Sequence, residues 1–409
     1  MGVLEKPIII DGVTINNRVV FQPMEGCDCN EDGSPGELTI KKYVAEAKSG
    51  AGILWLEASA VCKEGRTSGR QMRITRENLD EYKKFVRTLK ETGLKENGFE
   101  PILIVQLTHS GRQSVVPMIA YRHPLYDQRK PVTDANIVTD EYLDTVPDMY
   151  VEGAMLAYEA GFDGVDVKSC HGYLFQEFLS AYGREGRYGG SFENRTRLYR
   201  NCISAVRKAV DSIENRRPFI VASRLGISDM VAKPYGFGTD EDNNIDLTES
   251  IELIRIIHQE GINLINITIG NPYYNPHINR PFRKGAYEPP EAPQEGLDRF
   301  YESEKKLKEI FPDVYFVGSA LSYYRGDMME IAEKQLSEGI YDLAGFGRVT
   351  LAYPEFYKDY LDGTFSPKKT CVTCSKCTEL MRAGCVSGCA VFNEYYRELY
   401  KEKVLCRKK

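Results

Sequence analysis

The sequence contains no long apolar run and no excess of basic residues. None of its apolar stretches approaches the roughly 20 residues that a membrane-spanning helix needs, which argues against a membrane protein. Its net charge of −6 and its isoelectric point near 5.7 argue against a nucleic-acid partner, because binding to a phosphate backbone requires a basic stripe.

The start of the chain also lacks the features of a secretory leader. Glu5 and Lys6 interrupt a short apolar stretch, and no small-residue cleavage site follows. We therefore expect a cytoplasmic protein whose 11 cysteines stay reduced. Five of them fall between Cys371 and Cys389, a clustering that favours metal ligation over a disulfide framework.

Short apolar, β-branched runs alternate with amphipathic segments from residue 19 to residue 362. The strand candidates are residues 19–24, 52–58, 102–107, 164–169, 219–225, 264–270, 314–319 and 343–348. The helix candidates between and after them are residues 37–50, 78–92, 150–161, 195–210, 248–261, 301–311, 326–339 and 354–363, and several end on glycine. Near-continuous apolar strands are typical of parallel strands that are buried on both faces.

Eight such units predict an α/β fold of the (β/α)₈ TIM-barrel type over residues 1–365, followed by a cysteine-rich segment with a terminal helix over residues 366–409. A doubly wound sheet is the competing fold. It is disfavoured because no G-x-G-x-x-G motif follows an early strand.

Two connections are much longer than the usual two to six residues. They run from about residue 108 to 140 and from about residue 270 to 297, and both follow strand ends, where a barrel carries its substrate loops. The second is rich in Pro, Tyr and Arg, and the sequence leaves open whether it is a lid over a ligand or a surface loop.

Three hydrogen-bonding side chains follow the fourth predicted strand. Lys168, His171 and Tyr173 fall within six residues of the strand's carboxyl end, the edge at which barrel enzymes place their active sites. A polar loop that merely covers the strand end is the alternative interpretation.

The residues after this strand carry a family resemblance. The segment HGYLFQEFLS, followed by YGGSFENRTR, resembles the Old Yellow Enzyme family of flavin-dependent ene-reductases. The resemblance implies that Lys168 and His171 bond the substrate carbonyl and that Tyr173 donates a proton. Relatives usually have His at the first of these positions, so Lys168 departs from the pattern and leaves open which substrate group it binds.

A flavin mononucleotide (FMN) presents an amide-like ring edge and a phosphate, and the strand ends offer groups for both. Gln106 can donate to and accept from the ring edge, and Arg224 can place a positive charge beside it, roles that the resemblance also implies. The phosphate site is predicted at Gly318, Ser319, Gly347 and Arg348, in the two loops that form the common barrel phosphate site. The resemblance adds backbone contacts from Gln22, Pro23, Met24 and Ala58, and leaves the orientation of Glu25 open.

The cysteine-rich segment carries the most specific local motif. Cys371, Cys374 and Cys377 have C-x₂-C-x₂-C spacing, and with one later cysteine they provide the four thiolates of a 4Fe–4S cluster. A structural zinc ion is the alternative metal that these cysteines could bind. The segment resembles the iron–sulfur branch of the same family, which includes 2,4-dienoyl-CoA reductase, 2-enoate reductase and trimethylamine dehydrogenase. That resemblance favours Cys389 over Cys385 as the fourth ligand.

The predicted function is reduction of the C=C bond of an enone or enoate by FMN, with electrons delivered through the cluster. C–N bond oxidation and an electron-transfer subunit of a larger complex are the alternatives, and a homo-oligomer is compatible with the sequence. Relatives in the branch continue into a nucleotide-binding module whereas this sequence ends at Lys409. We therefore expect ferredoxin, flavodoxin or a separate flavoprotein reductase to donate electrons, rather than NADH directly.

Overall fold

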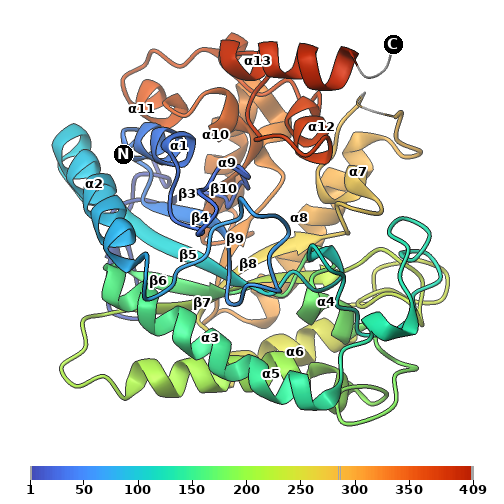
Figure 1. Ribbon diagram of the computed structural model, residues 1–409. Coiled ribbons are helices and arrows are strands. Elements are labelled where there is room, and N and C mark those ends of the chain that lie inside the picture. The colour runs from blue at the N-terminus through green and yellow to red at the C-terminus, as the bar shows by residue number, and fades with distance from the viewer. Residues whose placement is uncertain (1, 284, 286, 407–409) are drawn as a thin grey trace.

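A closed barrel of eight parallel strands forms the centre of the molecule in the computed structural model, which describes residues 2–283, 285 and 287–406 (Figure 1). The strands are β3 (Val19–Phe21), β4 (Ile53–Ala60), β5 (Ile102–Thr108), β6 (Gly164–Val167), β7 (Ile220–Ser228), β8 (Leu264–Ile269), β9 (Tyr315–Gly318) and β10 (Leu343–Phe346). They pair in chain order, and β10 closes the barrel against β3. Each lies largely within one predicted strand segment, so the predicted (β/α)₈ fold is confirmed.

Helices surround the barrel and correspond to the predicted ones. They are α1 (Glu37–Ala47), α2 (Leu79–Asn97), α3 (Asp140–Ala160), α5 (Phe192–Asp211), α6 (Thr248–Gln259), α8 (Pro293–Ile310), α9 (Met328–Ser337) and α11 (Phe356–Leu361). The start of α3 lies ten residues before the predicted one, because the Thr139 side chain accepts a hydrogen bond from the Tyr142 amide and caps the helix there. Gly161 ends the same helix in the left-handed conformation.

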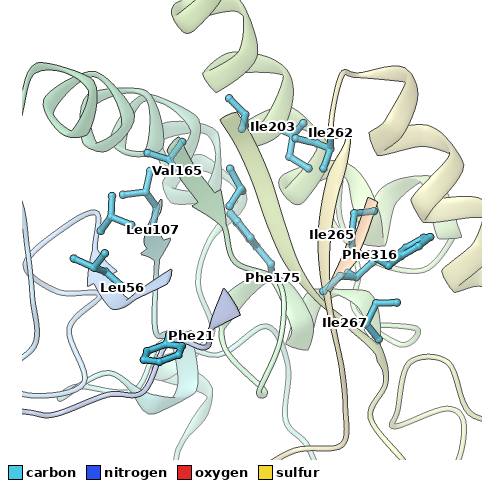
Figure 2. Packing of buried hydrophobic residues seen from close by; sticks show 14 of the residues in the cluster. Phe21, Leu56, Leu107, Val165, Phe175, Ile203, Ile262, Ile265, Ile267 and Phe316 are labelled. Atoms are coloured by element: carbon cyan, nitrogen blue, oxygen red, sulfur yellow. The ribbon is translucent and has the colours of Figure 1, made fainter. Parts of the chain in front are cut away.

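The main core lies between the strands and this ring of helices. Figure 2 shows Leu56, Leu107 and Val165 on the strands packed near residues of the surrounding elements, such as Phe175 and Ile203. All five side chains are at most 2% exposed. Truncation of such a side chain to alanine typically costs about 2–5 kcal/mol, so this layer is the main source of the barrel's stability.

A short hairpin that the sequence did not predict closes one end of the barrel. It consists of β1 (Ile8–Ile10) and β2 (Val13–Ile15). Its Ile10 and Ile15 are buried with Ile53 and Trp55 of the barrel interior in a second apolar cluster. Because Ile53 starts β4, the hairpin covers the amino ends of the strands and the carboxyl ends remain available for a site.

The remaining helices and turns are short, and several of them contribute residues to the cavity at the carboxyl ends of the strands. The helices are α4 (Leu174–Leu179), α7 (Pro276–Asn279), α10 (Arg348–Ala352), α12 (Lys376–Arg382) and α13 (Glu394–Tyr400), and the tighter or wider turns are η1 (Gly111–Gln113), η2 (Asp134–Asn136), η3 (Leu321–Asp327), η4 (Pro367–Lys369) and η5 (Lys401–Leu405). Figure 1 shows α12 and α13 in red, close together near the carboxyl terminus. Over the described part of the chain, no helix combines the length and the apolar character that a membrane crossing requires.

Candidate active site

A cavity of about 400 Å³ opens at the carboxyl ends of the strands. Such a volume lies in the range of cofactor and substrate pockets. The predicted site residues that line it are Gln22, Pro23, Met24, Ala58, Gln106, Lys168, His171, Tyr173, Arg224, Ser319, Gly347 and Arg348. Gly318 ends β9 nearby but does not line the cavity. A Cβ on it would lie 2.3 Å from the Tyr341 ring, so packing already requires a glycine there.

The loop after β6 folds so that its three candidate residues share this cavity. Lys168 follows the last residue of β6, and its Nζ lies 3.7 Å from the centre of the Tyr173 ring. His171 and Gly172 both have positive φ, which turns the chain sharply before α4. A Cβ at Gly172 would lie 2.3 Å from Asn271 Nδ2, so only glycine fits at that position.

Burial sets the charge of these groups. It lowers the pKa of His171 well below its usual range, and the cations of Arg224 and Lys168 lower it further, so the imidazole is neutral at pH 7. The His171 Nε2 atom is buried without a hydrogen-bond partner. Burial also lowers the pKa of Lys168 and raises that of Tyr173 well above its usual range, so Tyr173 keeps its proton. The neutral imidazole of His171 and the protonated phenol of Tyr173 therefore line the same cavity.

Tyr273 is a functional candidate that the sequence did not single out. Tyr273 belongs to the long loop after β8 and lines the cavity. Its hydroxyl lies 3.2 Å from the hydroxyl of Tyr173. Pro272, Asn279 and Arg280 of the same loop also line it, so the first part of this loop covers the cavity as a lid does. Two residues of the predicted lid, Lys284 and Ala286, lie outside the described residues.

A buried carboxylate supports the cavity floor. Asp166 on β6 accepts hydrogen bonds from Gln106 Nε2 at 2.6 Å, from Trp55 Nε1 at 2.9 Å and from the Arg224 backbone N–H at 2.6 Å. Burial raises its pKa to about 6, and the three donors oppose that shift. Because Asp166 takes an N–H of Gln106, the amide oxygen of Gln106 remains available to a ligand. The Nε of Arg224 is buried without a partner, as a group that awaits a ligand would be.

The loop after β3 is held by a buried ion pair. Lys42 on α1 pairs with Glu57 on β4, and Lys42 Nζ also donates to the Met24 carbonyl at 3.1 Å. Glu57 accepts from the Gly26 N–H at 2.8 Å. Glu57 itself lies at an irregularity in the pairing of β4 with β5, where strands next to active sites often bulge. These contacts fix the backbone of Met24 and its neighbours at the cavity edge.

Glu25, whose orientation the sequence left open, lines the cavity. Its Oε1 accepts a hydrogen bond from Thr67 Oγ1 at 3.1 Å. Its negative charge acts on Lys168, Tyr173 and Tyr273.

The cavity fits the two parts of FMN. Arg348 NH1 is buried without a hydrogen-bond partner beside Gly347, where the sequence predicts the phosphate. At Ser319, also predicted at the phosphate, the N–H donates to Glu304 and the hydroxyl donates to the Ile267 carbonyl. Gln22 is oriented by Asn266, whose Nδ2 donates to Gln22 Oε1 at 2.7 Å. Unpaired donors at Arg224 and Arg348 thus match a polar ring edge and an anion.

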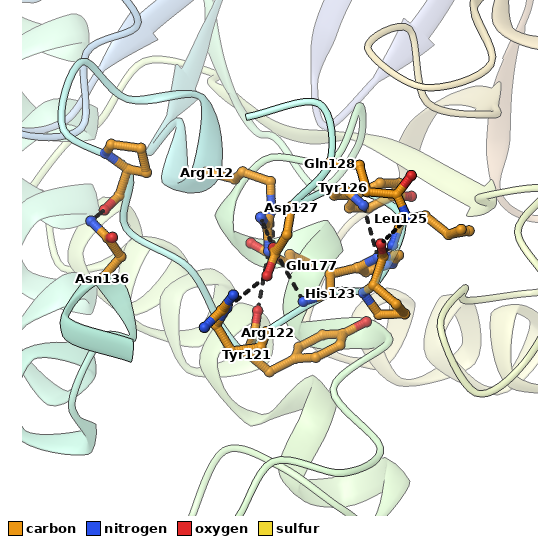
Figure 3. A network of polar contacts seen from close by, with 12 residues as sticks. Arg112, Tyr121, Arg122, His123, Leu125, Tyr126, Asp127, Gln128, Asn136 and Glu177 are labelled. Carbon is orange, nitrogen blue, oxygen red and sulfur yellow. Dashed lines mark hydrogen bonds and ion pairs between the residues drawn. The ribbon is translucent and has the colours of Figure 1, made fainter. Parts of the chain in front are cut away.

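A second buried ion pair positions the helix that follows Tyr173. Arg112 in η1 donates to Glu177 on α4, at 2.8 Å from its Nε, and to Asp127 at 2.6 Å, as Figure 3 shows. Arg112 is 1% exposed and Glu177 is 2% exposed, so removal of one partner would leave a buried charge. Because Tyr173 caps the start of α4, this pair holds the backbone of Tyr173 in place.

Four cysteines surround a second, small cavity. Its lining includes Cys371, Cys374, Cys377 and Cys389 but not Cys385, whose thiol donates instead to the Ala383 carbonyl at 3.8 Å. In the part of the chain that is described, no three His, Cys, Asp or Glu side chains converge as ligands of one metal ion. The four thiols nevertheless border a common volume, so these residues fit a group that is held by four thiolates.

The cysteine segment also forms one wall of the large cavity. Cys377 lines both cavities, and Met381 and Arg382 on α12 line the large one. Hydrogen bonds join the segment to several barrel loops. They include those from Ser387 N to Gly26 O at 2.7 Å, from Arg70 to Gly384 O at 2.6 Å and from Arg382 to Pro272 O at 3.1 Å.

Comparisons with known proteins agree with this geometry. Residues 4–362 match the model of the NADH:flavin oxidoreductase / NADH oxidase family. Along 386 residues, 93% of the chain and 52% of the relative, the chain is 26% identical to an NADH oxidase of Thermoanaerobacter brockii.

Two solved structures share the fold along almost the whole chain. A 2-naphthoyl-CoA reductase in complex with 2-naphthoyl-CoA has a TM-score of 0.77 at 21% identity, over 97% of this chain and 58% of that one. A histamine dehydrogenase from Rhizobium sp. 4-9 has a TM-score of 0.72 at 17% identity, over 97% of this chain and 53% of that one. The chain spans about half the length of these three relatives. The resemblance to Old Yellow Enzyme is confirmed, and the chain belongs to the NADH:flavin oxidoreductase / NADH oxidase family.

Proposed function

We propose that this flavoprotein is an ene-reductase that uses FMN to reduce the C=C bond of an α,β-unsaturated carbonyl compound. When bound, FMN supplies hydride chemistry. The residues that would hold it are those that line the cavity beside Gln106 and Arg224, with Arg348 at the phosphate. All 11 cysteines are free, which fits a reducing, cytoplasmic setting.

The observation that carries this proposal is the arrangement of Lys168, His171 and Tyr173 around one cavity. Lys168 and His171 can bond a carbonyl oxygen and stabilise the negative charge that develops on it. Tyr173 is protonated and lies against Tyr273, so it can give a proton to the α-carbon and recover one through Tyr273.

The alternative, oxidation of a C–N bond, is supported by the fold shared with histamine dehydrogenase. The charge of the cavity favours the ene-reductase. Lys168, Arg280 and Arg382 line it, whereas a protonated amine substrate would require carboxylates or an aromatic cage. Glu25 is the single carboxylate among the residues that line it.

We further propose that Cys371, Cys374, Cys377 and Cys389 hold a 4Fe–4S cluster that receives electrons from an acidic carrier protein such as a ferredoxin or flavodoxin. Residues 366–409 contain ten Lys or Arg and four Glu, whereas the chain as a whole has a net charge of −6. Val372 lines both the cysteine cavity and a surface groove that also contains Arg283, Arg325 and Lys368. A negatively charged partner would therefore be attracted to the face nearest the cluster.

The test is to photoreduce the purified protein without oxygen and mix it rapidly with 2-cyclohexenone, with no protein partner present. Fast reoxidation with formation of cyclohexanone supports the ene-reductase. An electron-transfer subunit would remain reduced. Bleaching of the oxidised protein by histamine or trimethylamine, with no reaction toward the enone, would instead establish C–N oxidation.

A further inference from the structure

A second hollow, an open groove of about 750 Å³, lies beside the large cavity. It is lined by residues from three chain segments, which are 63–69, 115–118 and 135–142. Its walls are largely apolar, and Val115 and Val116 within it are 67% and 68% exposed. Apolar side chains that gather in an exposed groove are typical of a surface that binds an apolar ligand.

The groove adjoins the large cavity at Ser68, which lines both. On each side of this junction the chain runs from one hollow to the other. Thr67 and Gln113 line the cavity, and Val115, two residues after Gln113, lines the groove. The two segments are joined here, because the Val115 N–H donates to the Arg66 carbonyl at 3.0 Å. A ligand in the cavity can therefore reach the groove by passing over Ser68.

The groove is also linked through the backbone to the proposed proton donor. The Ser110 N–H donates to the Gly65 carbonyl at 2.9 Å, and the Leu174 N–H donates to the His109 carbonyl at 3.2 Å. Since Leu174 follows Tyr173, one loop connects the groove segment to the start of α4. An extension of a substrate that lies against Tyr173 thus has a short path to the groove.

Hydrogen bonds hold the groove in shape. Arg66, which is 7% exposed, donates to the carbonyls of Glu31 at 2.8 Å, Gly69 at 2.7 Å and Gln71 at 2.6 Å. These bonds fix the backbone that carries the junction with the cavity. A surface that is already ordered loses little conformational entropy when a ligand binds, so its apolar area can contribute to affinity.

We propose that this groove binds an apolar tail of the substrate: the activated C=C bond lies in the large cavity, and an alkyl extension passes Ser68 and covers Val115 and Val116. The inference rests on the proposed ene-reductase activity and adds that an elongated, apolar compound is preferred to a compact one. Because burial of apolar surface is favourable in proportion to its area, each added methylene should increase affinity until the groove is filled.

Gly69 offers a way to fill the groove without disturbing the fold. It lines the groove, and a Cβ built on it would meet no atom of the described residues within 4 Å. Its φ lies outside the left-handed region, so a larger side chain is not strained there. Gly183 has the same properties but lines neither the groove nor the cavity, which makes Gly183→Phe a matched control for Gly69→Phe.

The experiment uses linear unsaturated ketones that share one head and differ in the tail: 3-penten-2-one, 3-octen-2-one and 3-undecen-2-one. Binding to the oxidised, FMN-loaded protein is measured by titration calorimetry, without turnover. Wild type is compared with Gly69→Phe, with Gly183→Phe and with the double variant Val115→Ser, Val116→Ser, whose changes are both at exposed positions.

We expect wild type to bind the longest ketone at least tenfold more tightly than the shortest. Gly69→Phe should lose most of this gain and bind the shortest ketone within twofold of wild type. The double serine variant should reduce the gain about threefold, and Gly183→Phe should retain it.

Three results would overturn the proposal. Equal affinity of wild type for all the ketones would show that no tail is bound, and an equal gain in wild type and Gly69→Phe would place the tail elsewhere. A wild-type dimer that dissociates in Gly69→Phe on sedimentation, with ketone affinities unchanged, would make the groove a contact between two copies of the chain. If the gain and its loss in Gly69→Phe are both found but the photoreduced protein reduces none of the ketones, the ene-reductase fails while the apolar groove stands.

Discussion

The barrel and the cysteine segment differ in the size of the apolar core that stabilises each of them. The barrel buries a continuous layer of apolar side chains, many of them fully inaccessible to solvent. The segment after residue 365 has a core of four buried side chains, and Phe392, Tyr395 and Leu405 are 39–52% exposed. Its helices α12 and α13 have seven residues each, too short to be stable alone. The contrast indicates that the barrel is stabilised by its own contacts, and it leads us to expect that the segment gains much of its stability from the proposed cluster.

The largest expected effect follows from removal of one thiol, which should change the cysteine segment and leave the barrel intact. Cys389→Ser should lose nearly all iron from protein purified without oxygen, because three ligands cannot hold the cube, while FMN stays bound. Limited proteolysis should then cut beyond residue 365, with the barrel's melting temperature little changed.

Cys385→Ser is the matched control. The Cys385 side chain lies outside the cysteine cavity, so this variant should keep its iron. The reverse pattern would make Cys385 the fourth ligand. About one zinc per chain and no iron in wild type would refute the cluster altogether.

The second effect concerns chemistry in the barrel alone. Tyr173→Phe should leave substrate binding and flavin reduction nearly intact and slow substrate reduction by roughly 10²- to 10⁴-fold, the usual range for loss of a proton donor. Rapid mixing of the photoreduced protein with substrate measures it.

Tyr273→Phe tests whether Tyr173 recovers its proton through the hydroxyl of Tyr273. It retains the ring but removes the hydroxyl that lies 3.2 Å from Tyr173, so we expect a smaller slowing, about tenfold or less. An unchanged rate in Tyr173→Phe would mean that the proton comes from another group.

A third, smaller effect should appear in the segment alone. Lys368→Glu reverses an exposed charge in the groove beside the cysteine loop and should slow reduction by an acidic ferredoxin by about three- to tenfold at low ionic strength. Stopped-flow rates of wild type and variant should converge at high salt, and dithionite should reduce both equally. Lys84→Glu on α2 is the control. Rapid, saturable reduction of wild type by NADH would instead show that nicotinamide enters the cavity itself.

The smallest effect is a pH dependence confined to the barrel, because the cysteine segment contains no histidine. Burial lowers the pKa of His109 and of His123 to about 4. Their Nδ1 atoms accept backbone N–H groups of Gly111 and of Leu125 and Tyr126, so protonation would break these bonds.

The unfolded chain takes up these protons near pH 6.5 and the folded protein near pH 4. The contribution of these two histidines to stability should therefore fall as pH decreases from about 6.5 to about 4, by about 1–3 kcal/mol for each, whereas buried carboxyls such as Glu46 and Asp229, whose pKa values are raised to about 7, act in the opposite sense. Urea unfolding at a series of pH values measures it. His123→Asn should flatten the slope, whereas His258→Asn on α6 should not. An equal slope in His123→Asn would locate the titration elsewhere.

The sequence predicted the features that depend on local pattern. Eight apolar runs gave the strands, and Lys168, Gln106 and Arg224 were identified because strand ends converge in a barrel. The hairpin Ile8–Ile15 was missed because strands of three residues carry too short a pattern.

Contacts between residues far apart in the chain could not be predicted from the sequence. Tyr273 lies 100 residues from Tyr173, and Arg112 lies 65 from Glu177, so no spacing joins them. Asp166 was read as part of a strand, and its role under Gln106 appears only when the barrel closes. The groove beside the cavity likewise depends on which chain segments the folded barrel brings together.

The cysteine segment walls the cavity through Cys377, Met381 and Arg382 and is joined to several barrel loops by hydrogen bonds. If the proposed cluster forms, it would give maturation an order: flavin would enter before the segment is fixed, and insertion of iron would then close the cavity wall behind the flavin. We expect cells starved of iron to accumulate a flavin-loaded, open form, and reloaded protein to retain its flavin far longer than that precursor.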